Sequence, residues 1–486
     1  MFRNIARWPG HCALLVMPLL GGCLVLGPDY KPPALAPGDV PATWTSPAAT
    51  VDTSEPAAQW WRELSDPVLD ELIDHAFRDS PTLEVAMARL REARAASTRA
   101  GASALPGLSG SGAAERGDAS RSDGPSNSGW LSLNSSWELD LFGAVARNRE
   151  GAAAREAVRL ATLGDARVSL AADVADAYLA YRACQSELAL AEEDIVSREA
   201  TRKLTEDSVE AGFMAPFESI RSTASVAEAR ARLASTRADC QQLENLITRL
   251  SGLPRPTLSA LLADLPTGLN RLPEPRNPDV AIPAKAVMQR PDVRAAERAL
   301  AAASADIGLA EADRYPRVAL NGELGYSSSG GAGGGYVSLG SWSFGPSISL
   351  PIFDGGRRKA AVQAAQARYD ESLAEFRARA RDAIQDVENA LTRYAAANER
   401  ADNARKAAQQ YQRYFEAVES RYREGASNLL ELEDARRAML DARQTLLGVQ
   451  RERLQAWISL NRATGGGAQY EPDPPAQTAA ASTAKP

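Results

Sequence analysis

Residues 143–205 read GAVARNREGAAAREAVRLATLGDARVSLAADVADAYLAYRACQSELALAEEDIVSREATRKLT. This stretch holds no proline, and most of its residues are good helix formers such as alanine, arginine, glutamate and leucine. Apolar residues recur in it at helical spacing, among them Val168, Ala171, Ala175, Leu179 and Ala183. At ~1.5 Å per residue, about 60 residues make a helix of roughly 90 Å. Such a length is typical of a coiled coil or a helical array.

The chain repeats this pattern once. A second proline-free run of the same kind extends from Gly355 to about Arg423. Ahead of the two runs, SPTLEVAMARLREARAASTRAGASALP (80–106) aligns without a gap with RPDVRAAERALAAASADIGLAEADRYP (290–316). Each half reads as helix, strand, loop, strand, long helix, tight turn and helix, so we predict one duplicated unit. The predicted parts are a first repeat at 59–252, a linker at 253–290, a second repeat at 291–465 and a disordered tail at 466–486.

The N-terminus predicts a targeting segment. Arg3 and Arg7 precede the apolar run CALLVMPLL, which is too short to span a bilayer as a stable helix. We therefore predict a signal peptide at 1–22. The motif LGGC, ending at Cys23, resembles a bacterial lipobox, in which the cysteine becomes the lipid-carrying first residue; the alternative is an ordinary signal peptide that happens to hold a cysteine. Residues 23–58 are rich in proline and alanine, which predicts an extended arm between the lipid anchor and the body.

Composition limits the functional classes. The chain has 55 lysines and arginines against 62 aspartates and glutamates, and loss of the signal peptide changes its formal charge from −7 to −9. So acidic a chain is a poor binder of nucleic acid. His11 leaves with the signal peptide, so His75 alone cannot assemble a histidine metal site or a Ser-His-Asp triad within one copy. We therefore expect no enzyme activity, no metal and no cofactor beyond the lipid on Cys23.

The period of the apolar residues changes to two in the regions of about 105–140 and about 316–352. In GWLSLNSSWELDLF (129–142) the apolar residues fall mainly on one parity, which predicts a strand with one apolar face. In YVSLGSWSFGPSISL (336–350) the parity switches near Gly340, which predicts a β-bulge. Each region therefore predicts a β-hairpin with a polar loop. The glycine-rich loops match no phosphate-binding motif, because they open no helix.

Two β-hairpins give four strands per chain. Four strands cannot close into a barrel, since small barrels need about eight, and an open sheet edge is not tolerated in lipid. Strands of about ten residues with alternating faces are typical of membrane barrels. We therefore expect several copies to share one barrel, and three copies in a symmetric ring would supply about twelve strands.

Several long motifs carry a family resemblance: GPDYKPP, WWRELSDPVLDELI, SWELDLFG, LPIFDGGRRKA and RYREGASNLLELEDARRAML. In this order they resemble the outer-membrane factor (TolC) family, and more narrowly the NodT-type outer-membrane lipoproteins of tripartite efflux systems. The likeness covers nearly all of the mature chain.

The resemblance implies a mixed fold of long α-helical hairpins and two β-hairpins. It implies a homotrimer with a periplasmic α-barrel and a 12-stranded β-barrel in the outer membrane of a Gram-negative bacterium. An equatorial collar would come from Trp60–Ser80, from the linker 253–290 and from the end of the chain. The implied function is a passive exit duct for drugs or other small toxic compounds. An inner-membrane pump of the resistance-nodulation-division (RND) type would supply them through a periplasmic adaptor.

Each long helix is expected to end in a tight turn that faces the inner membrane. Glycine ends both helices, at Gly212 in EAGFMAP and at Gly425 in EGASN, and Asn428 is placed to cap the helix that follows. By the resemblance, Gly212, Phe213, Gly425 and Asn428 are candidates for contact with the adaptor.

The resemblance also implies a gate at NLLELEDARR (428–437). The matching positions are Leu430 for an apolar ring, Asp434 for an acidic ring and Arg437 for a network of ion pairs. Three carboxylates around one axis repel one another, and opening would require the helices to shift. The alternative is that Asp434 and Arg437 form an ordinary exposed pair, worth a few tenths of a kcal/mol. Glu431 and Glu433 add charge here and could take over the role.

Cys184 precedes Gly212 by 28 residues and Cys240 follows it by 28, so an antiparallel hairpin puts the two at about the same height. Because the periplasm is oxidising, we predict a disulfide between them. The alternative is two buried, unpaired cysteines that pack as small hydrophobic residues.

Three other functions are alternatives to this one. An envelope enzyme is disfavoured by the absence of a catalytic motif, and a lipoprotein that tethers the outer membrane to the cell wall would not need amphipathic strands. The third is a protein-secretion channel of the type I kind. The lipobox and the collar motifs favour small-molecule efflux over this last alternative.

Overall fold

The computed structural model describes residues 25–34, 40–45, 50–51, 59–117, 126–263, 265–266, 271–275, 279–280, 283–330 and 335–468. The predicted signal peptide, the predicted lipid-bearing Cys23 and nearly all of the predicted C-terminal tail lie outside these residues.

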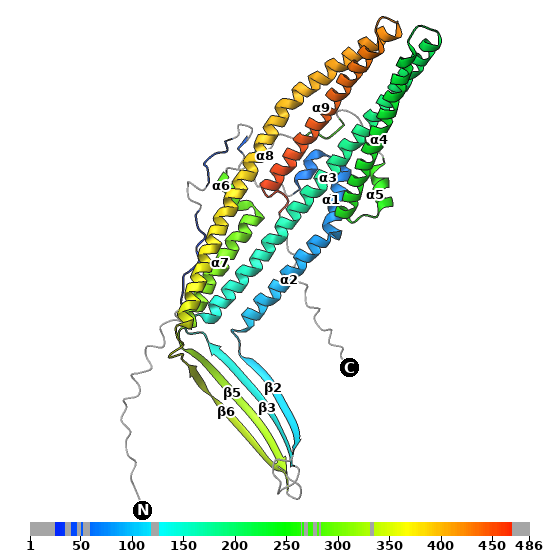
Figure 1. Ribbon diagram of the computed structural model, residues 1–486. Helices are drawn as coiled ribbons and strands as arrows, with labels where there is room; N and C mark the ends of the chain where they lie inside the picture. The colour runs from blue at the N-terminus through cyan, green and yellow to red at the C-terminus, as the bar shows by residue number, and fades with distance from the viewer. Residues whose placement is uncertain are drawn as a thin grey trace, which may run out of the picture. The chain divides into compact units, whose positions relative to one another are not determined.

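The predicted order of elements is present in both repeats (Figure 1). The first repeat contains η2 (Trp60–Leu64), α1 (Pro67–Asp79), α2 (Pro81–Ala102), β2 (Gly107–Gly117), β3 (Ser126–Leu139), α3 (Ala144–Glu210) and α4 (Pro216–Ser251). The second contains α7 (Pro291–Ala312), β5 (Arg317–Gly330), β6 (Val337–Ser349), α8 (Arg357–Arg423) and α9 (Leu429–Ala463). Both α3 and α8 have 67 residues, roughly 100 Å at ~1.5 Å per residue.

Local sequence explains where these helices begin and end. Asp66 caps α1 by accepting hydrogen bonds from the backbone N–H groups of Val68 and Leu69, and Pro67 takes the first helical position. Gly252 ends α4 with a φ of 73°, a left-handed conformation that favours glycine.

The segments between and before the repeats contain structure that the sequence did not predict. The linker forms α5 (Arg255–Leu262), β4 (Asp279–Val280) and α6 (Pro283–Gln289), and β4 pairs in parallel with β1 (Thr50–Val51) from the N-terminal arm. Within the described part of the arm, Trp44 is buried in a core cluster with Leu391 and Leu460.

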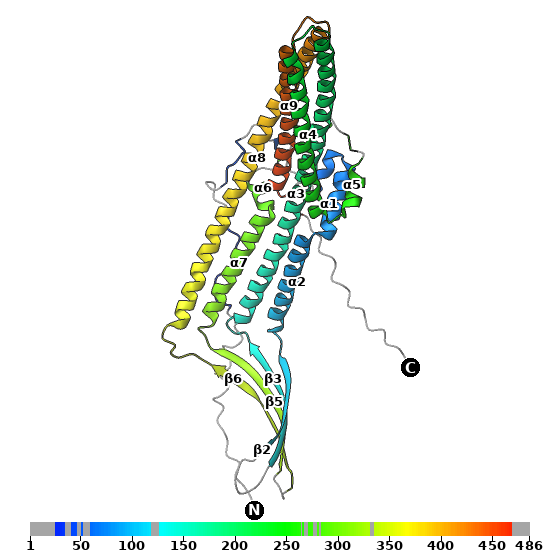
Figure 2. The ribbon, with the colours of Figure 1, turned by 45° about the vertical axis from the view of Figure 1, so that its right-hand side comes forward.

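Strands β2, β3, β5 and β6 form one antiparallel sheet in that order, and Figure 2 shows its curvature. The predicted bulge at Gly340 is wrong. Tyr326 lies opposite Gly340, and the pairs on either side, Ser327 with Leu339 and Gly325 with Ser341, keep the same register. No residue is inserted, so the change of parity means that the apolar side chains change face along β6.

The described chain divides into two compact units, and both repeats contribute to each. One unit comprises residues 1–33, 90–158 and 296–375, and it contains the sheet with the adjoining parts of α2, α3, α7 and α8. The other comprises residues 34–89, 159–295 and 376–486. Its core includes Trp60, which meets Trp61 and Trp457 edge to face at 5.6 Å and 5.3 Å between ring centroids.

Candidate functional site

The turns that join α3 to α4 and α8 to α9 lie side by side, and we call them the first and second tips (Figures 1 and 2). At the first tip Gly212 has a φ of 82°, and the N–H of Phe213 donates to the carbonyl of Ser208 at 2.8 Å. The second tip repeats this geometry: Gly425 has a φ of 74°, and the N–H of Ala426 donates to the carbonyl of Arg421 at 2.8 Å. Both are the glycine-dependent helix endings that the sequence predicts.

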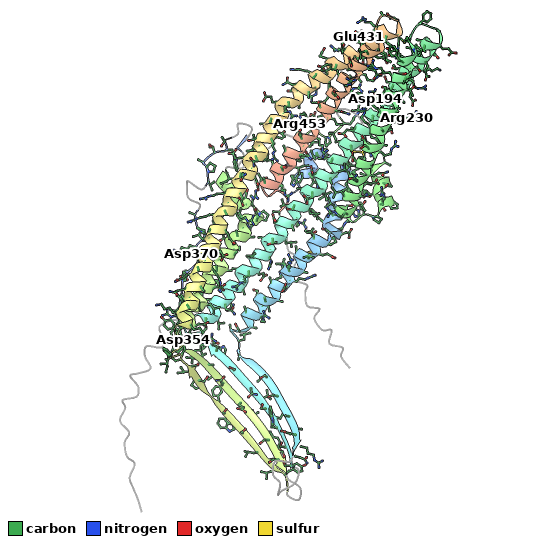
Figure 3. The ribbon with its side chains drawn as sticks, viewed as in Figure 1. Asp194, Arg230, Asp354, Asp370, Glu431 and Arg453 are labelled. Atoms are coloured by element: carbon green, nitrogen blue, oxygen red, sulfur yellow. A yellow bond between two sulfur atoms is a disulfide. The ribbon has the colours of Figure 1, made fainter. Side chains whose placement is uncertain are left out.

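Asn428 begins the return helix of the second tip. Its side-chain oxygen accepts a hydrogen bond from the N–H of Glu431 at 2.8 Å, as expected of an N-cap. The Glu431 carboxylate, labelled in Figure 3, also accepts from Ser427 at 2.5 Å and pairs with Arg421 at 3.1 Å. These bonds fix the shape of the second tip.

The two tips share a buried core. We call α3 with α4 the first hairpin and α8 with α9 the second hairpin. The Tyr422 hydroxyl of the second hairpin lies 2.8 Å from the Thr205 hydroxyl of the first and 4.0 Å from the sulfur of Met214. Burial raises the pKa of Tyr422 above its ordinary value. Met214 and Leu440 pack at the margin of this core. The buried apolar side chains of α8 and α9 that surround Tyr422 are Phe415, Val418, Leu429, Leu432, Ala435 and Met439.

The first tip exposes large apolar side chains. Phe213 is 87% exposed, and Phe217 and Ile220 on the first turns of α4 are also exposed. The second tip offers glycine, alanine, serine and asparagine at Gly425 to Asn428 instead. The two tips therefore share a backbone shape and differ in surface chemistry.

The predicted gate residues lie on the exposed face of α9. Leu430 is 50% exposed, and Arg437 pairs with Asp434 at 3.5 Å between solvent-exposed side chains. Their spacing of four and three residues places them on one side of the helix. Within one chain they form the ordinary surface pair that was the alternative interpretation, which contributes only tenths of a kcal/mol.

Four charged residues form a buried cluster behind this face, which the sequence did not predict. Arg198 on α3 pairs with Asp194 at 2.7 Å and with Glu433 on α9 at 2.9 Å. Glu433 also pairs with Arg436 of the same helix. The Arg436 side chain is completely buried, and it donates to the hydroxyls of Ser197 at 3.2 Å and Thr201 at 2.7 Å. Asp194 is labelled on α3 in Figure 3.

This cluster is electrically neutral, since two arginines face two carboxylates. Burial lowers the pKa of Arg436, and the charge of Glu433 counteracts that shift in part. Removing one partner from a buried pair costs about 3–5 kcal/mol, because it leaves an uncompensated charge. The cluster therefore ties α3 of the first hairpin to α9 of the second. The signal in the sequence is the i, i+4 pair Asp194–Arg198 and the i, i+3 pair Glu433–Arg436 within apolar stripes.

A disulfide joins Cys184 on α3 to Cys240 on α4, with 5.6 Å between their Cα atoms. Both residues are buried. The bond therefore links the two helices of the first hairpin, and the second hairpin contains no cysteine.

The sheet has two chemically different faces. Antiparallel partners share a face, and the register places most of the exposed apolar side chains of the four strands on one of them: Leu108, Leu131, Leu133, Trp137, Leu324, Tyr326, Trp342, Phe344 and Ile348. The opposite face carries mostly polar residues: Ser109, Ser111, Ser132, Asn134, Ser136, Glu138, Asn321, Glu323, Ser341, Ser343 and Ser347. Trp130, Val337 and Leu339 also lie on this face, near the starts of β3 and β6. Alternation of this kind is typical of a membrane β-barrel wall.

In the part of the chain that the structure describes, no helix combines the length and apolarity needed to cross a bilayer. The same residues include no group of three or more His, Cys, Asp or Glu side chains that could hold a metal ion.

Comparisons with known proteins agree with this geometry. The family model described as outer membrane efflux protein matches residues 72–253 and 282–466. Nodulation protein T of Rhizobium leguminosarum bv. trifolii is 32% identical over 460 residues, covering 93% of this chain and 96% of that protein. The pyoverdine export outer membrane protein OpmQ of Pseudomonas putida is 32% identical over 485 residues, covering 95% and 98%.

Among solved structures, the outer-membrane channel OprN aligns with a TM-score of 0.79 at 31% identity, covering 91% of this chain and 99% of that one. The long helical hairpins, the two-faced sheet and the extent of these matches lead to one conclusion: the chain belongs to the outer membrane efflux protein family.

Proposed function

We propose that three copies of this chain form one passive exit duct through the outer membrane. The observation that carries this proposal is the four-stranded sheet, with one apolar face, one polar face, and β2 and β6 at its edges. Unpaired edges cannot face lipid. Because β2 and β6 run antiparallel, β6 of one copy can pair with β2 of the next, and three copies close a ring of twelve strands. The polar faces then line the lumen.

The tips are proposed to meet a periplasmic adaptor. The exposed Phe213 beside Gly212 supplies an apolar contact, and Gly425 with Asn428 supplies a small polar one. Leu430, Asp434 and Arg437 then face the other copies around the axis and close the duct at rest. The buried cluster of Asp194, Arg198, Glu433 and Arg436 supports this arrangement, since it holds the second hairpin against the first within each copy.

The proposed cargo is a drug or another small toxic compound, delivered by an inner-membrane RND pump. Relatives are named for pyoverdine export, for antibiotic efflux and for toluene efflux, so the names within the family differ in cargo. A lipid on Cys23 is proposed to anchor the chain. Its support is the lipobox and the docking of Leu26, whose N–H donates to the carbonyl of Phe142 at 3.2 Å.

Two measurements test the duct. Light scattering of the protein in mild detergent is expected to give three chain masses, and planar bilayers are expected to show single-channel conductance that rises in Asp434→Ala/Arg437→Ala. A single water-soluble chain, or no conductance in either form, would refute the proposal.

Expression in a strain that lacks its own outer-membrane efflux channel tests the proposed cargo. Restored resistance to small toxic compounds is expected, and secretion of a protein substrate alone would favour the type I kind of channel.

A further inference from the structure

The connection between β6 and α8, LPIFDGG at 350–356, exposes apolar side chains that the duct does not use. Ile352 and Phe353 are each 92% exposed, and Leu350 is also exposed. Adjacent apolar side chains this open to water mark a surface that something covers.

The connection holds these side chains outward through a defined turn. The Asp354 carboxylate, labelled in Figure 3, accepts from the N–H of Gly356 at 2.9 Å and from the N–H of Arg358 at 3.2 Å. It also pairs with the Arg358 guanidinium at 3.2 Å. The neighbouring Arg357 and Lys359 are exposed, and neither has an ion pair among the described residues. Two free cations therefore lie within seven residues of two exposed apolar side chains.

The sheet register places this turn beside the strand ends that also lead into the start of α3. Leu139, Val318 and Ile348 form one row across β3, β5 and β6; β3 and β6 end near this row, and β5 begins near it. The start of α3 also receives the N-terminal arm. A Cβ on Gly143 would lie within 3 Å of Val25, and Arg147 donates to the carbonyl of Leu26 at 2.9 Å.

The docked arm, together with the lipid proposed on Cys23, indicates where the bilayer ends. Cys23 is two residues before Val25, so a lipid on Cys23 would enter the membrane beside these strand ends. Nearby, Phe142 stacks on Tyr315 with 5.0 Å between ring centroids. Aromatic side chains and cations at such a boundary are typical of the interface between acyl chains and headgroups.

We propose that Ile352, Phe353, Arg357 and Lys359 form a binding site for an anionic phospholipid of the inner leaflet of the outer membrane. The apolar pair enters the acyl region, and the two cations bind the headgroup phosphate through charge-assisted hydrogen bonds. The continuous apolar face of the sheet, which ends at Ile348, favours lipid over a second protein surface. The site rests on the proposed placement of the sheet in the bilayer.

Spin labels in phospholipid nanodiscs test the apolar half. The assembled protein would carry a nitroxide at Phe353→Cys, with Ile348→Cys and Ser347→Cys as controls on the two faces of β6. Oxygen should relax the labels at 353 and 348 strongly, and a water-soluble nickel complex should relax the label at 347. Nickel access at 353 would place it in water, and shielding from both reagents would place it against another copy; either result overturns the site. Nickel access at 348 would instead refute the placement of the sheet.

Native mass spectrometry tests the charged half. The wild-type assembly should retain phosphatidylglycerol in preference to phosphatidylcholine. In Arg357→Gln/Lys359→Gln the preference should fall about thirty-fold, since each cation near an anionic surface contributes about five-fold. Arg368→Gln, which removes an exposed charge further along α8, is the matched control and should keep the preference. Equal retention by the double variant and the wild type would overturn the headgroup assignment.

Discussion

Arg436 shows how one residue can determine whether two hairpins hold together. Its guanidinium is completely buried, lies 5.4 Å from the ring of Phe415, and pairs with Glu433 behind the exposed surface of α9. Its neighbour Arg437 points outward and pairs with Asp434 at 3.5 Å. Two adjacent arginines therefore contribute very differently to stability. A buried charge needs its partner to compensate for lost hydration, whereas an exposed charge is solvated by water.

Arg436→Met is expected to destabilise the protein by about 3–5 kcal/mol, since two carboxylates would then share the single cation Arg198. Melting of the helical circular dichroism signal in detergent should shift clearly downward. Arg437→Ala is the matched control, with an expected loss of at most about 0.5 kcal/mol. Adding Glu433→Leu to Arg436→Met should recover much of the loss. Equal melting of the two single variants would contradict the role of the cluster.

Asp292 should make stability depend on pH. Burial acts to raise its pKa, but hydrogen bonding and charge from Arg290 outweigh burial, and the pKa is lowered from its ordinary value. Arg290 binds Asp292 at 2.8 Å and Asp386 at 3.1 Å, and it donates to the carbonyl of Ala463. A lowered folded-state pKa contributes stability above the unfolded-state value, and that contribution is lost as the pH falls through the folded-state pKa.

Asp292→Asn should therefore melt below the wild type at pH 7, and the difference should shrink as the pH falls below about 4. Thermal melting at pH 7, 5 and 3 measures it. Asp434→Asn, at an exposed carboxylate, should change little at pH 7. A difference for Asp292→Asn that grows towards acid would have the wrong sign for this account.

At the level of elements, the long helices and the tips were the most predictable parts. Residues 143–205 keep helical spacing without a proline, so the local sequence is enough to predict a helix there without knowledge of the tertiary packing. The buried cluster is not evident in the sequence, because Asp194 and Arg198 have the spacing of a solvent-exposed pair and only the fold shows that α9 covers them. The prediction of a bulge at Gly340 was wrong because the sequence pattern has two possible causes. A change of apolar parity can mean either that the apolar side chains change face or that a residue is inserted.

The disulfide between α3 and α4 gives a prediction at this level. The mature protein with lipid on Cys23 should show no titratable thiol when it is unfolded without reduction, and reduction should release the two thiols of Cys184 and Cys240. Because the bond spans 56 residues, chain entropy predicts roughly 4 kcal/mol of stabilisation. Cys184→Ser/Cys240→Ser should therefore melt at a lower temperature than the wild type. Two free thiols before reduction would show that the cysteines pack unbonded.

At the level of the whole molecule, the two faces of the sheet determine which substitutions the assembly tolerates. Phe344 and Ser343 are adjacent on β6, and the register places Phe344 on the apolar face and Ser343 on the polar face. An arginine in contact with lipid costs about 2–4 kcal/mol near the bilayer midplane and less near its surfaces. The same arginine in a water-filled lumen avoids that cost.

Phe344→Arg should therefore reduce the amount of assembled protein in the outer membrane several-fold, and Ser343→Arg should leave it nearly unchanged. Heat-modifiable mobility of outer-membrane fractions on gels would measure both. Equal loss in the two variants would show that neither face is selected for lipid. A greater loss in Ser343→Arg would reverse the assignment of the faces.

The pairing of β3 with β5 has an evolutionary consequence. These strands come from different repeats, and their contact joins the second strand of one hairpin to the first strand of the next. In the proposed ring, β6 of one chain meets β2 of its neighbour in the same relation. The hydrogen-bonded seam inside each chain and the one between chains are then equivalent, which implies an ancestor half this length whose six subunits enclosed the same pore.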